Sequence, residues 1–254
     1  NGMVYIRGQA QDYDHWAQLG NRGWSFQDVL PVFKRMERFE GGSDEFRGRD
    51  GILPVTHTPR HKVPLLEKII EAAEKMGLPY NPDQNGATQE GVGMSQVTIT
   101  RGRRQSTAFC YLDPARSRAN LQIDQGAVAE SLILEGRRCL GVRYSVNGQK
   151  REARATRDVV VSGGSINSPK LLELSGIGQG DRLRALGIAP VHELPGVGEN
   201  LRDHYSPRMK FEITGRNLTF NDNARGWRLA REALKYAMFR DGFLASTAVP
   251  IRLY

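Results

Sequence analysis

The sequence predicts an α/β protein, and two stretches of it carry that prediction. Residues 159–161 are three consecutive valines, a pattern typical of a strand buried on both faces of a parallel sheet. Paired glycines, Gly163 and Gly164, follow, and a helical pattern comes next. Residues 127–156 form three segments separated by Glu-Gly and Asn-Gly turn pairs, which predicts an antiparallel meander.

Two helices are predicted near the N-terminus. Asp12 is expected to cap a short helix that runs to Leu19. Ser25 and Asp28 have the spacing of a capping box and predict the start of a second helix. Pro31 lies within this second helix and predicts a kink there.

The clearest helical pattern spans residues 63–76, where apolar residues recur on one face and Gly77 supplies a stop. The neighbouring segments predict a loop at 41–51, turns at 81–93, a strand at 95–100, and a short helix that Ser106 caps and that ends before Asp113.

The C-terminal half predicts three more helices and one strand. Ser168 is expected to cap the helix after the paired glycines, with Pro169 at its first position. A short helix at 181–186, a turn-rich boundary at 195–204, a half-exposed strand at 209–213 and an amphipathic helix at 227–239 are predicted to follow.

Composition and charge exclude several classes of protein. The 254 residues are 39% hydrophobic, enough for a core, yet no apolar stretch approaches the ~20 residues of a membrane span. The net charge is +8, but only residues 101–104 form a dense basic run, so nucleic-acid binding is not expected. Cys110 and Cys139 lack metal-binding spacing and are expected to be buried, reduced thiols. We therefore expect a cytoplasmic protein, with peripheral attachment to the inner membrane as the alternative.

Several catalytic and binding motifs are incomplete in this sequence. The Gly-x-Gly pairs that begin at Gly176 and Gly196 lack either the preceding strand or the third glycine of a dinucleotide fingerprint. None of the five histidines lies four residues from another on a predicted helix, so no metal site is expected. His204, next to Asp203, fits either an oriented base or a structural hydrogen bond. The paired glycines at 163 and 164 fit either close approach to a ligand or a simple tight turn.

Four ordered motifs carry a family resemblance. They are NGMVYIRG at the start, QEGVG with the later GRRQSTAFCYL, SGGSINSPKLLELSGIG, and PGVGENLRDH. Together they resemble the glucose-methanol-choline (GMC) flavoprotein oxidoreductases, most closely the choline-dehydrogenase-like branch, over essentially the whole chain. The resemblance implies an FAD enzyme that oxidises a primary alcohol by hydride transfer to the flavin while a histidine takes the hydroxyl proton.

The resemblance also implies which residues contact FAD. The first three residues match the family segment that lies along the flavin and its linker. Val128 matches the position whose backbone meets the adenine, although a strand core residue is the alternative interpretation. The implied cofactor-binding residues are Asn1, Gly2, Met3, Val128, Gly163 and Gly164.

Two departures from the family pattern matter. Family members begin with a strand and a G-x-G-x-x-G motif, which do not precede Asn1 here. The catalytic histidine belongs to the family's C-terminal part, which is expected beyond Tyr254. We therefore expect an internal fragment with no catalytic residue of its own, inactive when expressed alone. Arg202 also replaces the glutamine that is usual in the fourth motif.

The resemblance implies how the chain is divided. Residues 1–54 would cover the flavin, 55–118 and 205–254 would form parts of the substrate domain, and 119–204 would form part of the FAD-binding domain. The whole protein is expected to oxidise the CH–OH group of a small alcohol, choline-like or other, with the electron acceptor left open. The alternative is a non-catalytic basic binding module, which a colourless purified protein would indicate.

Overall fold

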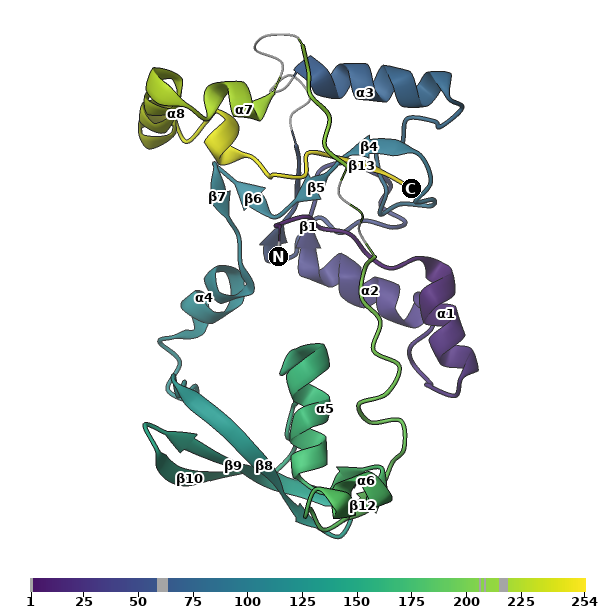
Figure 1. Ribbon diagram of the computed structural model, residues 1–254, viewed down its shortest axis with the longest axis vertical. Coiled ribbons are helices and arrows are strands. Elements are labelled where there is room, and N and C mark those ends of the chain that lie inside the picture. The colour runs from purple at the N-terminus through teal and green to yellow at the C-terminus, as the bar shows by residue number, and fades with distance from the viewer. Residues whose placement is uncertain (1, 59–63, 206, 208, 215–218) are drawn as a thin grey trace. The chain divides into compact units, whose positions relative to one another are not determined.

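The computed structural model describes residues 2–58, 64–205, 207, 209–214 and 219–254. Contacts within the chain divide it into two compact units (Figure 1). Unit 1 comprises Asn1–Arg118 and Glu212–Tyr254, and unit 2 comprises Ala119–Phe211. Each unit is described by itself below.

Unit 1 begins with two helices, α1 (Ala10–Gln18) and α2 (Phe26–Met36). The prediction that Asp12 caps α1 is wrong, because Gln9 is the N-cap and donates its backbone N–H to the Asp12 carboxylate at 2.8 Å. The capping box of α2 is confirmed, since the side chains of Ser25 and Asp28 satisfy each other's backbone N–H. The α2 assignment continues through Pro31.

Helix α3 (Pro64–Lys75) carries the apolar core of unit 1. Leu66, Ile70 and Ala73 are buried on one face, as their spacing predicts, and they pack with Val92 and Met94. The helix ends where the N–H of Leu78 bonds the Ala73 carbonyl and Gly77 adopts a φ of 88°. Val63, the predicted start, lies outside the described residues.

The strands of unit 1 are short and pair in twos. They are β1 (Glu37–Arg38) with β2 (Leu53–Pro54), β3 (Thr56–His57) with β5 (Gln96–Val97), β4 (Val92–Met94) with β13 (Ile251–Leu253), and β6 (Ile99–Thr100) with β7 (Arg103–Arg104). The predicted strand at 95–100 is therefore divided, because its two halves pair with different partners. Strand β4 also begins inside the segment predicted as turns, where it pairs with β13 from the far end of the chain.

The segment after Ser106 differs from the prediction. A π-helical turn, η2 (Ala108–Leu112), leads directly into α4 (Asp113–Ala115), so the helical path does not end before Asp113. Pro114 lies within this continuous helical path and has no backbone N–H to contribute to it.

Unit 2 contains the predicted meander, formed by β8 (Ala127–Glu135), β9 (Arg138–Val146) and β10 (Gln149–Arg154) in the order β10-β9-β8 (Figure 1). Asn147 and Gly148, with φ values of 51° and 79°, make the tight turn between β9 and β10. Unit 2 continues with α5 (Gly164–Leu174), β11 (Ile177–Gly178), α6 (Gly180–Ala185) and β12 (His192–Glu193).

Two predictions about unit 2 are wrong. Helix α5 begins at Gly164 with Gly163 as N-cap, so Ser168 and Pro169 lie inside it and not at its start. Residues 159–161 are not a strand, and Val160 is 83% exposed. A strand requires a neighbour for its backbone groups, and no described strand lies beside this run.

The C-terminal part contains α7 (Phe220–Asn223), the predicted amphipathic helix α8 (Gly226–Phe239) and the 3-10 turn η3 (Phe243–Ala245). The predicted strand at 209–213 is wrong, since Met209 and Phe211 are exposed and the described residues there form no ladder. Among the described helices, none combines the length and the apolar character that crossing a bilayer requires. The mixture of helices and strands confirms the α/β class.

Candidate cofactor-binding site

A groove in unit 2 runs between the meander and α5 and has a volume of about 540 Å³. Val128 of β8 and Gly163 at the N-cap of α5 both line it, so the structure brings together two of the predicted residues. Gly164 is the first residue of α5 and has a φ of 84°. The other lining residues are Ala127, Ala129, Leu132, Val142, 159–162, Asn167, Lys170, Leu171 and Leu174.

A serine fixes the two walls of this groove to each other. The Leu132 N–H of β8 donates to Ser175 Oγ at 2.8 Å, and the Ser175 hydroxyl donates to the Leu171 carbonyl of α5 at 2.6 Å. Sequence reasoning did not identify Ser175. The one feature of the sequence that could have indicated its role is its position, directly before Gly176 at the expected end of the helix.

The groove offers apolar contact and one charge. Val128 is 63% exposed and is not a core residue, so the strand-core alternative is wrong. Lys170 is the one charged side chain among the lining residues. β8 is the last strand in the meander order, so one side of its backbone lies outside the ladder. Such a site can hold a flat ring against valines and an anionic group near the ammonium.

The N-terminal residues lie in unit 1 as an extended segment. Asn1 is outside the described residues, and Gly2 and Met3 lead into a short antiparallel pairing in which Val4 faces Val97 of β5. The Thr98 N–H donates to the Met3 carbonyl at 2.8 Å. Met3 has a φ of 66°, which a non-glycine residue rarely adopts.

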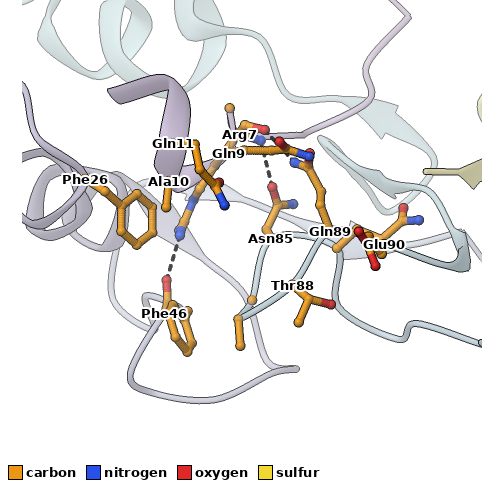
Figure 2. Close-up of a pocket in the computed structure, with 14 residues that line it drawn as sticks. Arg7, Gln9, Ala10, Gln11, Phe26, Phe46, Asn85, Thr88, Gln89 and Glu90 are labelled. Atoms are coloured by element: carbon orange, nitrogen blue, oxygen red, sulfur yellow. Dashed lines mark hydrogen bonds between the residues drawn. The ribbon is translucent and has the colours of Figure 1, made fainter. Parts of the chain in front are cut away.

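Arg7 ends this segment at a second pocket, of about 400 Å³ (Figure 2). The Arg7 N–H donates to the Asn85 side-chain oxygen at 2.7 Å, and the guanidinium donates to the Phe46 carbonyl, also at 2.7 Å. Dashed lines mark both bonds in Figure 2. The Asn85 amide donates to the Tyr5 carbonyl at 3.1 Å, and the Gln89 amide donates to the Arg7 carbonyl at 2.8 Å. Side chains from other parts of unit 1 thus hold the segment at Tyr5 and at Arg7.

Beneath the segment lies a buried charge network. Both Glu37 oxygens accept from Arg47, at 2.8 and 3.1 Å, and Arg7 reaches the same carboxylate at 2.8 Å. Arg47 also donates to Asp83 at 2.5 Å and to Gln96 at 2.8 Å. The side chains of Glu37 and Arg47 are fully buried, so each charge depends on its partners for stabilisation.

Two titratable groups around this network are perturbed. Burial, reinforced by the negative charge of Glu37, raises the pKa of Tyr5 to about 12. Burial of the imidazole lowers the pKa of His57, whose ring lies 5.0 Å from that of Phe39. Tyr5 and His57 are therefore neutral at pH 7.

Other sequence interpretations find no supporting geometry. The side chains of Asp203 and His204 are 98% and 99% exposed, and 3.9 Å separates the imidazole from the carboxylate, so the oriented-base interpretation of His204 is wrong. In the described part of the chain, no cluster of three or more His, Cys, Asp or Glu residues could hold a metal ion.

Sequence reasoning missed the residues that hold segment 2–7 in place. Asn85, Gln89 and Gln96 stand in stretches that were interpreted as turns or as a strand. Polar residues are ordinary in such stretches, so nothing local marked them as buried partners.

The chain was compared with known protein families and with curated relatives. The family model described as GMC oxidoreductase matches residues 1–206. The oxygen-dependent choline dehydrogenase of Chromohalobacter salexigens is 47% identical over 214 residues, which cover 84% of this chain and 38% of the relative. That of Brucella ovis is 43% identical over 95% of this chain and 44% of the relative. The chain thus spans about two-fifths of the length of these relatives.

Solved structures agree with the sequence comparisons. An FAD-dependent oxidoreductase from Chaetomium thermophilum matches 97% of this chain and 46% of its own, with a TM-score of 0.83 and 28% identity. Pyridoxine 4-oxidase from Mesorbium loti matches 77% of this chain and 38% of its own, with a TM-score of 0.71 and 34% identity. Since the family model covers most of the chain, the chain belongs to the GMC oxidoreductase family.

Proposed function

We propose that the protein containing this chain is an FAD-dependent oxidoreductase that acts on the CH–OH group of a small alcohol. The observation that carries this proposal is the groove of unit 2, where Val128 and Gly163 line one cavity as the family resemblance implies. The relatives support the same activity, because the two curated relatives described above are oxygen-dependent choline dehydrogenases.

The residues present fit an adenine dinucleotide. The valines of the groove offer flat apolar contact, Gly163 lies at the groove where α5 begins, and Lys170 can neutralise part of a phosphate charge. In unit 1, Gly2 has open space beside its Cα and Met3 has its carbonyl fixed. We assign these residues, with Gly164 and Asn1, to FAD binding.

FAD, when bound, supplies the acceptor for a hydride from the alcohol carbon. This chain's part is to hold and orient that group, and we assign no catalytic residue within it. The base that removes the hydroxyl proton is proposed to lie outside residues 1–254. In the same proposal, 119–204 belong to the FAD-binding domain, 1–54 cover the flavin, and 55–118 with 205–254 belong to the substrate domain.

The first test is cofactor content and its reduction. The purified full-length protein should release stoichiometric FAD on denaturation, and choline should bleach its flavin absorbance under anaerobic conditions. A quaternary ammonium alcohol is expected because the relatives are choline dehydrogenases. Bleaching by uncharged primary alcohols, measured in the same way, is compared with bleaching by choline. If these alcohols bleach the flavin and choline does not, choline is excluded as the substrate, but the proposal that the enzyme oxidises a small alcohol still holds. A colourless protein would contradict the enzyme and favour a non-catalytic module.

For the cellular location we propose the cytoplasm. The support is that Cys110 and Cys139 are both free, which suits a reducing compartment. Peripheral attachment to the inner membrane is the alternative, and fractionation of cell extracts at low and high salt distinguishes the two.

A further inference from the structure

Two threonine hydroxyls hold consecutive carbonyls of the N-terminal segment. The Thr247 hydroxyl donates to the Gly2 carbonyl at 3.0 Å. The Thr98 hydroxyl donates to the Met3 carbonyl at 3.3 Å, in addition to the bond from the Thr98 backbone N–H at 2.8 Å. The peptide groups on either side of the Met3 Cα are therefore both fixed from outside the segment.

These threonines come from distant parts of unit 1. Thr98 separates β5 from β6, and Thr247 lies between η3 and β13. Thr247 is only 2% exposed, and its oxygen also accepts from the Val249 N–H at 3.3 Å. A hydroxyl that is both buried and held in this way has little freedom, so it defines the position of the Gly2 carbonyl.

The conformation of Met3 explains why such restraint is needed. Its φ of 66° is in the left-handed region, which is unfavourable for a side chain with a Cβ. A residue remains there only when its surroundings hold it. The neighbouring Gly2 adds no restraint of its own, since nothing lies within 4 Å of where its Cβ would be.

We propose that Thr98 and Thr247 are positioning residues that hold the Gly2–Met3 backbone in a fixed conformation against the flavin. The inference rests on the proposed function, which places Gly2 and Met3 beside FAD. Thr247 has the larger role, because its hydroxyl makes the one threonine bond to Gly2, whereas Thr98 keeps its backbone bond to Met3 when its hydroxyl is removed.

The test compares Thr247→Val, Thr98→Val and the double variant in the FAD-loaded full-length protein. Each lost hydrogen bond is expected to raise the Kd for FAD by about three- to tenfold, with Thr247→Val at the upper end. The flavin midpoint potential should shift in the same order, which a merely structural role would not produce. Thr247→Ser keeps the hydroxyl and should restore both values.

The matched control is Thr58→Val. Thr58 is 3% exposed and donates its hydroxyl to the Ser95 carbonyl at 2.9 Å, so it is equally buried but bonds no residue of the N-terminal segment. This variant should leave the flavin midpoint potential unchanged and the Kd for FAD within about twofold of the wild type. The bond that it loses is of the same kind but does not reach residues 2–7. Equal shifts in Thr58→Val and Thr247→Val would overturn the inference.

A second measurement separates this inference from the proposed function. Hydrogen exchange of the peptide covering residues 2–7 should accelerate in Thr247→Val and in the double variant, with or without FAD. Unchanged exchange in both would overturn the positioning role. A wild-type protein that binds no FAD would instead refute the proposed function.

Discussion

The two units hold their predicted cofactor residues by different means. In unit 1, Gly2 and Met3 belong to a segment fixed by buried polar groups, and all buried charged side chains among the described residues lie in this unit. In unit 2, Val128 and Gly163 line an open groove with exposed valines. Among the described residues of unit 2, Ser175 has the one buried polar side chain. Buried polar and charged groups thus hold the predicted cofactor residues in unit 1. In unit 2 these residues are held by the strands of the meander and by helix α5.

The largest expected effect tests the charge network of unit 1. Arg47→Met leaves Glu37 and Asp83 without their main cation, which should lower the free energy of unfolding by about 3–5 kcal/mol. Urea unfolding followed by tryptophan fluorescence measures this, because Trp16, Trp24 and Trp227 all lie in unit 1.

The counterpart in unit 2 is Arg143→Met. The Arg143–Glu152 pair spans 3.0 Å, but both side chains are about half exposed. The substitution should therefore lower the free energy of unfolding by only roughly 0–1 kcal/mol, as measured by urea unfolding followed by circular dichroism. Similar losses in Arg47→Met and Arg143→Met would mean that burial does not distinguish the two units.

The next effect is the response to alkaline pH. Because the folded state holds Tyr5 neutral up to about pH 12 while the unfolded chain ionises near its ordinary pKa of 10.0, the raised pKa stabilises the fold below pH 10. That contribution is lost as the pH rises from 10 to about 12, which should lower the free energy of unfolding by roughly 2–3 kcal/mol. Unfolding of the wild type and of Tyr5→Phe across this range should show a shallower pH dependence in the variant.

Tyr144 supplies the unit 2 comparison. A hydrogen bond to the exposed Asp124 raises the pKa of Tyr144, but solvent screens this pair. Tyr144→Phe should therefore change the pH dependence less than Tyr5→Phe, and the reverse order would contradict the contrast between the units.

The last comparison concerns the glycines of the groove, where the expected loss of stability is smaller than for Arg47→Met. Gly164 has a φ of 84°, so Gly164→Val should cost about 1–2 kcal/mol. In Gly163→Val the new Cβ would lie 3.2 Å from Asn167 Cβ and from the Ser168 nitrogen. Both variants should lose bound FAD, measured by its absorbance after denaturation, because each distorts the turn that leads into α5 beside the groove.

Gly187→Val is the control for these two variants. Gly187 has a φ of 75° and open space around it, and it lies after α6, outside the groove. Its substitution should introduce similar backbone strain without loss of FAD. Stoichiometric FAD in folded Gly163→Val and Gly164→Val would remove this turn from the site.

The same contrast explains what sequence could predict. The meander of unit 2 and helices α3 and α8 depend on local signals such as Asn147-Gly148 and the apolar face of α3, so their prediction succeeded. The contacts of the N-terminal segment join residues far apart, such as Gly2 with Thr247, and no local pattern records them. The strands predicted at 159–161 and 209–213 failed because apolar sequence alone does not form a strand without a neighbour.

The outer strand of the meander has a consequence for the protein in concentrated solution. All six residues of β10 are exposed, and Lys150, Arg151, Glu152 and Arg154 stand among them. An open strand edge invites another chain to add to it, and closely spaced charges discourage that addition. β10 should therefore resist growth into intermolecular sheets, so the charges of this strand protect its edge of the meander from fibrillar aggregation.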